Sequence, residues 1–452
     1  MTLLNELSAE VCQRARMSRD PRFDGRFFVA VKTTGIFCRP ICPANLPKEE
    51  NVEYFSSQAL AVSAGYRPCL RCRPESAPHS WAWKGAETTF LRALTLIEQG
   101  ELDGSLETLA SRLGISDRYL RQLFQRHLGM PPKQYAQIQQ LMFAKQLLHT
   151  SQISITEVAY ASGFQSTRRF NDAFQKLFRL TPTQVRRERA ALPSRNHLSL
   201  AFRGPFDWAH MLDFYRLRAI EGMELVDEQS YQRHFVLGEG TGWFKASMAH
   251  SHLDIEFEME RLSDLRHLVA RLRRMFDLDA DLISIEAHLE QLAPGLVRRT
   301  GIRIPGVWNA WEAGVRAVLG QQVSVKAAIG QLNLLVSTLA ASEGSTRYFP
   351  TPEQVQMSDL SFLRMPERRK ETLKRLADYV RLHPMDSPMA WLSLSGIGPW
   401  TVDYAQLRGE SRSHCFLTGD LIVKKALAKF PQLTAESVAP WGSYATFHCW
   451  SH

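Results

Sequence analysis

Four cysteines near the start of the chain are spaced for metal binding. Three residues separate Cys38 from Cys42, two separate Cys69 from Cys72, and 26 lie between the pairs. Two short pairs on turns can bring four sulfurs to the corners of a tetrahedron, the geometry that Zn²⁺ prefers with thiolate ligands. In a reducing compartment, disulfides are the poorer explanation. The spacing therefore predicts one zinc ion bound by these four side chains.

A four-cysteine zinc site has two possible uses. The common use is structural, in which the closed site only holds the domain together. The other is chemical, because a zinc-bound cysteine is a thiolate at neutral pH and therefore a nucleophile. Four thiolates leave a formal charge of about −2, which favours attack of sulfur on an electrophilic methyl group. The spacing does not select one nucleophile among the four.

The sequence around these cysteines resembles the methylphosphotriester-repair domain of the Ada family. The stretches that carry the resemblance are RDPRFDGRFFVAVKTTGIFCRPICPA, NVEYF and AGYRPCLRCRPE. The resemblance implies that Cys38 accepts a methyl group irreversibly from a damaged DNA phosphate, and that the loss of charge tightens DNA binding. The family has a basic residue soon after the second cysteine, where this chain has Asn45. Basic neighbours expected to hold DNA phosphates are Arg39, Arg67, Arg71 and Arg73.

Two similar helical pairs follow the cysteine region, at 105–129 and 153–182. Each reads as helix, glycine turn and helix, with Ser116 and Ser166 as predicted N-caps of the second helices. Arg118, Arg121 and Arg168 fall on the polar faces. Two helical hairpins of no particular function would satisfy the same pattern. The duplication, with the helix expected at 132–150, resembles the AraC-type DNA-binding module, which implies that these arginines contact DNA.

The positive charge of the chain is concentrated in its first part. The chain carries a net charge of +9, with 11 basic against 8 acidic residues in 1–80, 15 against 9 in 81–190 and 29 against 29 in 191–452. A basic surface of this kind suits contact with a phosphate backbone. A solvated basic surface would have the same composition, so the charge supports DNA binding only together with the motifs.

The stretch LSGIGPWTVDYAQL (394–407) predicts a hairpin between two helices. The bare backbone at Gly396 and Gly398 can approach phosphates closely, and a helix N-terminus follows. Asp420 lies 22 residues after Gly398. This combination resembles the helix-hairpin-helix DNA glycosylases of the AlkA type. The resemblance spans roughly 196–452 and implies an antiparallel sheet subdomain followed by two helical subdomains that flank a cleft.

Asp420 is the predicted catalytic residue of that half. Base excision passes through an oxocarbenium-like sugar, which a nearby carboxylate stabilises. An isolated Asp before LIVKKAL could also simply cap a helix. The family resemblance places Trp400, Tyr404 and Trp450 in the base pocket, where aromatic faces bind electron-poor alkylated bases. It places Gln322 where the family often has an apolar wedge that fills the gap left by the flipped base.

The residue two positions beyond the second hairpin glycine predicts the reaction type. The resemblance implies this, because helix-hairpin-helix relatives that also cut the strand have a Lys there, whose amine forms a Schiff base with the sugar. This chain has Trp400 at that position, so we expect a monofunctional glycosylase that needs no cofactor. Lys424 and Lys425 on the following helix are expected to contact backbone phosphate.

The elements that position these residues predict a multidomain chain, mainly α with α+β parts. The expected domains are a small zinc-bound α/β domain (1–78), an all-α double helix-turn-helix domain (84–190), an antiparallel sheet subdomain (196–305) and a helical helix-hairpin-helix domain (306–452). Residues 191–197 read as a linker. A length of 452 residues suits several cores.

Together these features predict a cytoplasmic monomer for alkylation repair and adaptive-response regulation, without a membrane segment. The expected partners are damaged DNA, promoter DNA and, at a promoter, RNA polymerase. Two alternatives fit the same sequence: a transcription regulator whose glycosylase-like half is inactive, and an enzyme whose first 190 residues only recruit it to DNA. A release assay for free bases separates them.

Overall fold

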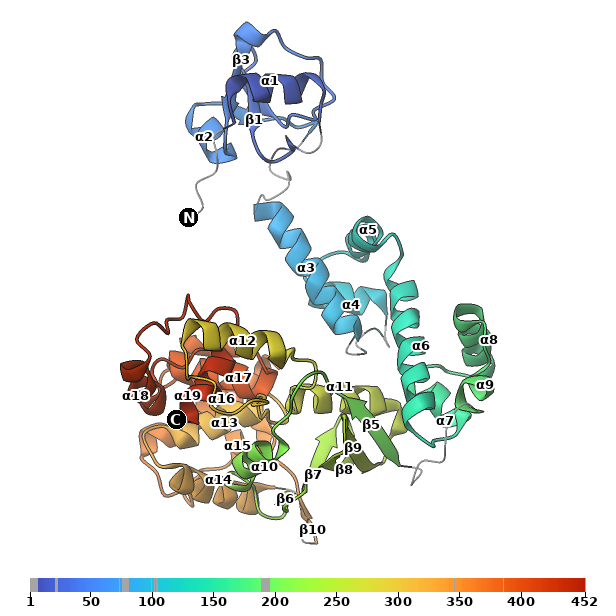
Figure 1. Cartoon of the computed structure of the whole chain (residues 1–452), viewed down its shortest axis with the longest axis vertical. Coiled ribbons are helices and arrows are strands. Elements are labelled where there is room, and N and C mark those ends of the chain that lie inside the picture. Colours follow the sequence, from blue (N-terminus) through green and yellow to red (C-terminus); the bar gives the residue numbers. More distant parts are fainter. Residues whose placement is uncertain are drawn as a thin grey trace. The chain divides into compact units, whose positions relative to one another are not determined.

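The computed structural model (Figure 1) describes most of the chain. It divides into two compact units, residues 1–137 and 138–452. Arg73 and most of the predicted linker lie outside the described residues. Those described are 7–20, 23–72, 74, 81–98, 100, 102, 105–187, 196–340, 342–344, 346–384 and 386–451.

The cysteine-bearing domain is built on a four-stranded sheet. Its elements are α1 (Ala9–Met17), β1 (Phe28–Val31), β2 (Ile36–Cys38), β3 (Val52–Phe55), α2 (Gln58–Ser63) and β4 (Arg67–Pro68). The strand order is β3-β1-β2-β4, with β1 antiparallel to both neighbours and β4 parallel to β2. Side chains alternate across a strand, so Val29 of β1 packs with Cys12 of α1, and Ala30 packs with Ala61 of α2. The central strand thus holds a helix against each face of the sheet.

Seven helices follow. They are α3 (Trp81–Glu98), α4 (Leu106–Arg112), α5 (Asp117–Leu128), α6 (Pro132–Thr150), α7 (Ile155–Ala161), α8 (Thr167–Phe178) and α9 (Pro182–Arg187). The predicted caps are confirmed, because the hydroxyls of Ser116 and Ser166 accept hydrogen bonds from the backbone N–H groups of Tyr119 and Arg169. The helix–glycine–helix prediction is confirmed as well, since both turns contain a glycine with positive φ, Gly114 and Gly163.

The boundary between the two compact units falls inside α6. The pair α4–α5 therefore belongs to the first unit and the pair α7–α8 to the second. Each pair has its own apolar contacts: Leu109 and Phe124 lie in one buried cluster, and Val158 and Phe174 lie in another. The repeated helix-turn-helix pattern thus folds twice around equivalent apolar positions.

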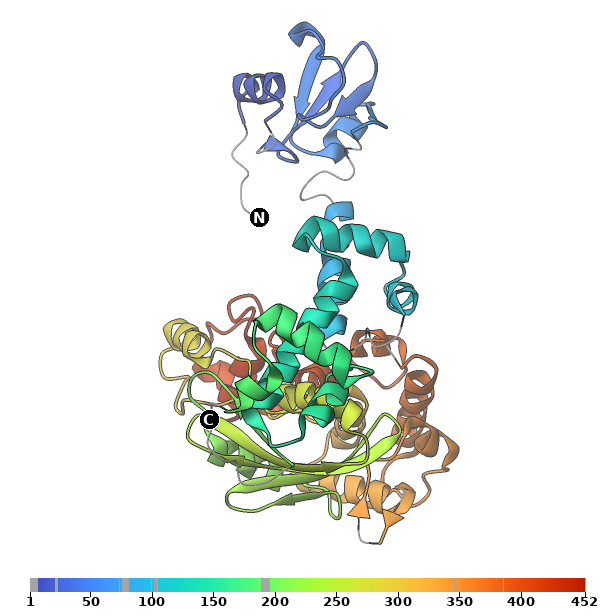
Figure 2. The same cartoon turned by 90° about the vertical axis from the view of Figure 1, so that its right-hand side faces the viewer.

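The second unit contains a five-stranded antiparallel sheet. Its strands are β5 (His197–Ala201), β6 (Glu224–Val226), β7 (Ser230–Leu237), β8 (Gly240–Met248) and β9 (His252–Met259). They pair in the order β5-β9-β8-β7-β6. Figure 2 shows this sheet in yellow-green. The period-two residues Leu253, Ile255 and Phe257 of β9 are all buried. The sheet subdomain expected from the sequence is thereby confirmed.

The rest of this unit consists of helices and a two-stranded antiparallel sheet of β10 (Ser342–Glu343) and β11 (Thr346–Arg347). The helices pack around two further cores. They are α10 (Trp208–Arg216), α11 (Leu265–Met275), α12 (Leu282–Leu292), α13 (Ala310–Gly320), α14 (Val325–Leu339), α15 (Pro352–Met357), α16 (Glu367–Leu382), η5 (Pro388–Ser393), α17 (Pro399–Glu410), α18 (Leu421–Lys429) and α19 (Gly442–Trp450). One core joins α13, α14 and α16, and the other joins α12, α18 and α19. Helix α17 contributes to both, through Val402 and Leu407 respectively. It is therefore held between the two helical cores.

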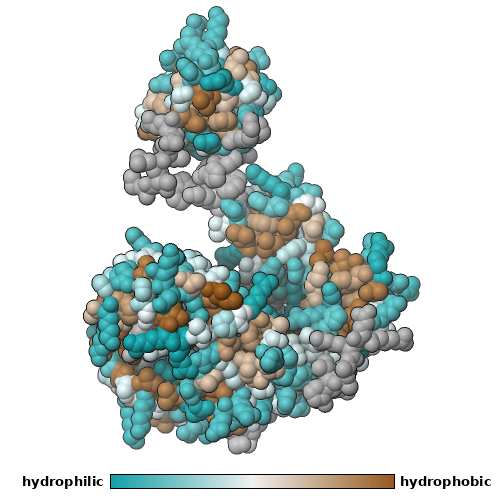
Figure 3. Space-filling model, in the orientation of Figure 1, coloured by the Kyte–Doolittle hydropathy of each residue, from teal (hydrophilic) through white to brown (hydrophobic). Residues whose placement is uncertain are grey.

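Hydrophilic residues cover most of the surface seen in Figure 3, and apolar residues appear there in small patches. Within the described part of the chain, no helix is both long and apolar enough to cross a membrane.

Candidate functional sites

The four paired cysteines form one cluster. Cys38 ends β2, Cys69 follows β4, and the backbone N–H of Cys69 donates to the carbonyl of Phe37 (3.0 Å), so strand pairing brings the two cysteine pairs together. All four sulfurs lie within 4.8 Å of one another, and none is in a disulfide. A tetrahedral zinc ion with bonds of about 2.3 Å holds its sulfurs about 3.8 Å apart. The donor set and its spacing therefore fit zinc.

The arginines near the cysteine cluster differ in whether they already form an ion pair. Arg39 is tied to buried Asp24: its Nε donates to Oδ1 (2.8 Å), and its Nη2 forms an ion pair with Oδ2. Its Nη1 also donates to the carbonyl of Cys72 (3.4 Å). By contrast, Arg67 and Arg71 are exposed. Of the three described arginines predicted to hold phosphate near this cluster, Arg39 is the one that is paired with a carboxylate.

The predicted DNA-contacting arginines of the helical pairs lie on exposed helix surface. Arg118 and Arg121 are exposed on α5, and Arg168 is exposed on α8. Arg121 forms an ion pair with Asp117 one turn earlier (3.0 Å). Exposed pairs of this kind are weak, so this contact leaves Arg121 able to exchange its partner.

A cavity of about 630 Å³ opens among α10, α13, α14, α17, α18 and α19. This volume lies in the usual range of small-molecule sites. Asp420, Trp400, Tyr404 and Trp450, four residues singled out from the sequence, all line it. Several of its lining residues are exposed apolar side chains, namely Leu217, Val323, Val325, Leu421 and Ile422.

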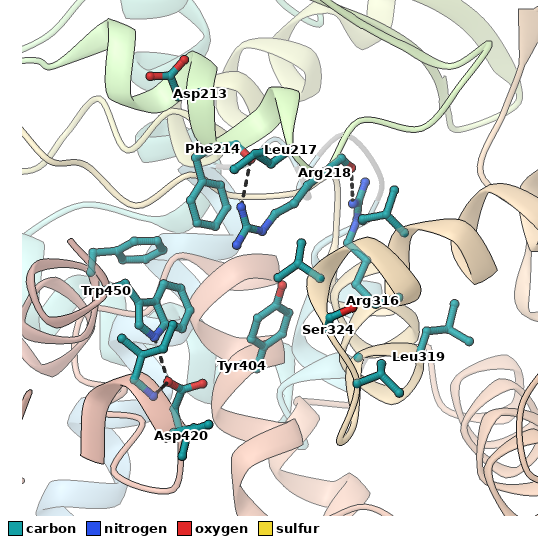
Figure 4. A pocket seen from close by; sticks show the side chains of 18 of the residues that line it. Asp213, Phe214, Leu217, Arg218, Arg316, Leu319, Ser324, Tyr404, Asp420 and Trp450 are labelled. Carbon is teal, nitrogen blue, oxygen red and sulfur yellow. Dashed lines mark hydrogen bonds between the residues drawn. The ribbon is translucent and has the colours of Figure 1, made fainter. Parts of the chain in front are cut away.

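Asp420 is both a helix cap and a cavity residue. Its Oδ1 accepts hydrogen bonds from the backbone N–H groups of Ile422 (2.9 Å) and Val423 (3.2 Å) at the start of α18. The indole Nε1–H of Trp450 donates to the same oxygen (3.1 Å), as Figure 4 shows. The capping interpretation and the catalytic one are therefore compatible, because the cap fixes the direction of the carboxylate.

Aromatic rings form two stacked pairs along the wall of the cavity. Trp400 and Tyr404, four residues apart on α17, stack with centroids 5.4 Å apart. Trp450 stacks on Phe214 of α10 with an interplanar angle of 15°. The hydroxyl of Tyr404 accepts a hydrogen bond from Arg408 Nη1 (2.9 Å). These contacts hold the rings so that a flat, electron-poor ligand meets π surface.

The sequence predictions named no cavity residue from α10 or the turn after it. Phe214 and Arg218 both line the cavity, and Arg218 Cζ lies 3.7 Å from the centroid of the Phe214 ring. The sequence signal for this pair was their i, i+4 spacing in FDWAHMLDFYRLRAI, because residues four apart lie on the same face of a helix. That signal alone could not place them opposite Asp420, some 200 positions later.

The hairpin glycines differ in what they require. Gly396 has φ of +93°, and an added Cβ would lie 2.1 Å from Thr372 Oγ1, so only glycine fits. Gly398 caps α17 in open space. The hairpin is joined to the turn after α13 by Gln321, whose Nε2 donates to the carbonyl of Gly396 (3.1 Å) and to Thr401 Oγ1 (3.2 Å). The next residue, Gln322, is exposed and has φ of +57°.

Comparison with known proteins finds three families along the chain. Residues 11–75 match the metal binding domain of Ada, residues 109–188 match a helix-turn-helix domain, and residues 197–309 match the AlkA N-terminal domain. The chain is 34% identical over 475 residues to the probable bifunctional transcriptional activator/DNA repair enzyme AlkA of Mycobacterium tuberculosis, covering 98% of this chain and 96% of that one.

Two Escherichia coli proteins resemble separate parts of the chain. DNA-3-methyladenine glycosylase 2 is 33% identical over 277 residues, covering 56% of this chain and 96% of that one. The bifunctional transcriptional activator/DNA repair enzyme Ada is 35% identical over 170 residues, covering 38% and 47%.

The fold and the sites define a DNA-repair and transcription-regulatory fusion of an Ada-type zinc domain, an AraC-type helix-turn-helix module and an AlkA-type glycosylase. The chain belongs to the family of bifunctional AlkA-type transcriptional activator/DNA repair proteins.

Proposed function

We propose that the C-terminal half removes alkylated bases of the 3-methyladenine type from DNA as a monofunctional glycosylase. The observation that carries the proposal is the cavity itself, where two stacked aromatic pairs face one oriented carboxylate. A flipped base would lie against the rings, and Asp420 would stabilise the positive charge that develops on the sugar as the C1′–N bond breaks. Water then adds to C1′ and leaves an abasic site.

The position of the amines supports a reaction without a strand-cutting step. Among the described residues that line the cavity there is no lysine, and Lys424 and Lys425 are exposed on α18. Trp400 occupies the position where bifunctional relatives need their lysine. Borohydride added during turnover is therefore expected to trap no covalent protein–DNA adduct, and a trapped adduct would show that an amine took part.

We also propose that the zinc domain binds one Zn²⁺ through Cys38, Cys42, Cys69 and Cys72, and that Cys38 accepts the methyl group of a DNA methylphosphotriester. Burial supports this choice in part, because Cys42 and Cys72 are buried, whereas Cys38 and Cys69 are partly exposed. The sulfur–methyl bond forms as the methyl–oxygen bond breaks, and the phosphate leaves as a diester anion. Each domain would react once. Peptide mass mapping after exposure to methylated DNA should find the added methyl on Cys38 alone.

The helix-turn-helix pairs are proposed to bind promoter DNA through Arg118, Arg121 and Arg168. Around the cysteine cluster, Arg39, Arg67 and Arg71 are proposed to hold DNA phosphates. In the glycosylase half, the hairpin at Gly396 and Gly398 is proposed to contact the phosphate backbone. Replacing Arg118 or Arg168 by Ala should weaken binding to duplex DNA at low salt without unfolding the chain. We further propose that the chain is a monomer in the cytoplasm, where thiolates stay reduced, and that it contacts RNA polymerase when bound at a promoter.

A further inference from the structure

Three arginines line the cavity, and they differ in their partners. Arg299 forms an ion pair with Asp207 (2.6 Å). Arg316 forms ion pairs with Glu312 (2.8 Å) and Glu224 (3.3 Å). Arg218 has no ion pair with any carboxylate in the described part of the chain, and its side chain hydrogen bond is Nη1 to the carbonyl of Phe214 (3.2 Å). Among the described residues, it is therefore the arginine of the cavity that forms no direct ion pair.

The position of Arg218 is fixed from three sides. Its backbone N–H donates to the carbonyl of Tyr215 (2.9 Å), and its own carbonyl accepts from Arg316 Nη1 (3.0 Å). Its guanidinium covers the face of Phe214 and lies between this ring and Tyr404 in the view of Figure 4. Burial lowers the pKa of Arg218 to about 10, with Arg408 and Arg316 also lowering it and Tyr404 acting in the opposite direction. The group still carries a full positive charge at neutral pH.

A fixed cation in a base cavity acts differently on neutral and on charged lesions. It repels a base with a permanent positive charge, because both charges lie in a site with little water to screen them. It attracts a neutral base that carries a carbonyl oxygen, because a guanidinium N–H group can donate a charge-assisted hydrogen bond to that oxygen. We propose that Arg218 is a specificity-determining residue that raises the excision of neutral, carbonyl-bearing lesions relative to that of cationic lesions, the 3-methyladenine type among them. This proposal rests on the proposed excision function.

The leaving group gives the same preference in the chemical step. When a neutral base departs, the C1′–N bond breaks with its electron pair on the base, and one proton of the attacking water ends on the base. Negative charge develops on the base before that proton arrives, and a nearby guanidinium stabilises it. A cationic base leaves as a neutral molecule, and the water proton goes to solvent. The charge of Arg218 therefore helps only the first reaction.

Two probes separate charge from shape. Hypoxanthine and N7-methylguanine carry the same carbonyl group at C6, but the first is neutral in DNA and the second is positively charged. Each is placed once in the same duplex opposite cytosine, and release of the free base is measured under single-turnover conditions. The variants are Arg218→Gln, which removes the charge, and Arg218→Lys, which keeps it. Arg261→Gln is the matched control, because Arg261 is exposed and neither it nor its carboxylate partners, Glu239 and Asp264, line the cavity.

For Arg218→Gln we expect hypoxanthine release to fall about tenfold or more, as for the loss of one charged hydrogen bond, while N7-methylguanine release stays equal or rises. Arg218→Lys should stay close to the wild-type ratio of the two rates. If Arg218→Gln melts like the wild type but slows both reactions equally, the proposed role of Arg218 in selectivity is wrong. The proposed excision function would still stand. A wild-type chain that releases neither base would overturn the excision function and this proposal with it.

Discussion

The cysteine cluster and the cavity hold their reactive groups in opposite ways. The cluster draws four sulfurs from Cys38 to Cys72 and gathers them within 4.8 Å in a small domain whose apolar clusters contain few residues. The cavity draws its lining from His210 to Ser451, and two large apolar cores hold α17 between them. The first site needs its metal to hold its shape, whereas the second is shaped by the packing of the scaffold. It should therefore be possible to destroy either site while the other keeps its function.

The largest expected effect is that of zinc removal. Structural zinc sites contribute roughly 10–16 kcal/mol of apparent binding free energy at neutral pH, which is also folding free energy for a small domain. Cys42→Ala removes one buried ligand and should unfold the cysteine-bearing domain, with loss of zinc and of methyl acceptance. Base release by the same protein should stay within about twofold of wild type. Zinc content and limited proteolysis report the first result, and a base-release assay reports the second.

A matched control for Cys42→Ala is Cys12→Ala, since Cys12 is also buried in this domain but lies outside the cluster. It should keep its zinc. A Cys42→Ala chain that binds a full equivalent of zinc would contradict the four-cysteine assignment. Loss of base release in this variant would contradict the independence of the two sites.

Asp420→Asn tests the cavity in the same way. The change keeps the shape of the side chain and its capping oxygen but removes the negative charge that faces the developing sugar cation. Base release should fall by about 10²–10³-fold, the usual cost of losing one electrostatic contact to a transition state. DNA affinity should be kept or rise slightly, because a carboxylate near phosphates repels them. Zinc content and methyl acceptance should not change.

Asp213→Asn is the control for this prediction. Asp213 also lines the cavity, but it is exposed and paired with Arg216. Its replacement should alter base release by less than the replacement of Asp420. Equal losses in both variants would show that any charge in the cavity suffices, and the specific role of Asp420 would be wrong.

How far apart in the sequence the residues of a site lie also decides what the sequence could predict. The cysteine cluster was predictable because its four members come in two closely spaced pairs, and this spacing alone indicates a metal site. The strands of the sheet and both helix-turn-helix pairs were predictable from periodicity, serine caps and glycine turns. Asp420, Trp400, Tyr404 and Trp450 were found through a family resemblance, because no local pattern in the sequence indicates that the three segments that carry them meet.

The residues that were missed depend on contacts made only in three dimensions. Arg218 is distinctive because its two cavity neighbours, Arg299 and Arg316, have carboxylate partners and it has none. That difference depends on ion pairs with residues far away in the sequence. The tie from Gln321 to the hairpin is of the same kind, since it joins positions 75 and 80 residues apart. For Arg39, the sequence predicted a phosphate contact but could not reveal its pairing with Asp24.

A smaller effect is expected at Asp277, which belongs to the scaffold of the cavity half. Burial raises the pKa of Asp277 to about 7, although Ile304 N–H (3.2 Å) and the Tyr444 hydroxyl (2.9 Å) donate to its Oδ2. The unfolded carboxyl titrates near pH 3.9. Between these values the folded state binds more protons, so the free energy of unfolding should fall as pH rises from about 4 to about 7.

Asp277→Asn should remove this pH dependence and raise the free energy of unfolding at pH 8 by about 2 kcal/mol. The largest gain that a pKa difference of three units allows is about 4 kcal/mol. Asparagine also tolerates the φ of +52° at this position. Denaturant unfolding at pH 5 and pH 8 measures the difference, with Asp279→Asn as an exposed control. If the two variants and the wild type share one pH profile, the buried carboxyl does not control it.

Replacing Gln322 should have the smallest effect on stability, and it tests whether this side chain is the wedge. A side chain at φ of +57° costs roughly 1 kcal/mol, and Gln322→Gly removes that strain but makes the unfolded chain more flexible. The free energy of unfolding should therefore change by less than about 0.5 kcal/mol. Base release should nevertheless slow about tenfold, because nothing then fills the gap left by a flipped base.

Gln322→Leu keeps a side chain at this position and should release bases at close to the wild-type rate. The anchor from Gln321 to Gly396 is intact in both variants, so the comparison isolates the side chain at 322. If Gln322→Gly releases bases as fast as the wild type, the wedge assignment is wrong, and exposed Val323, which lines the cavity, becomes the residue to replace.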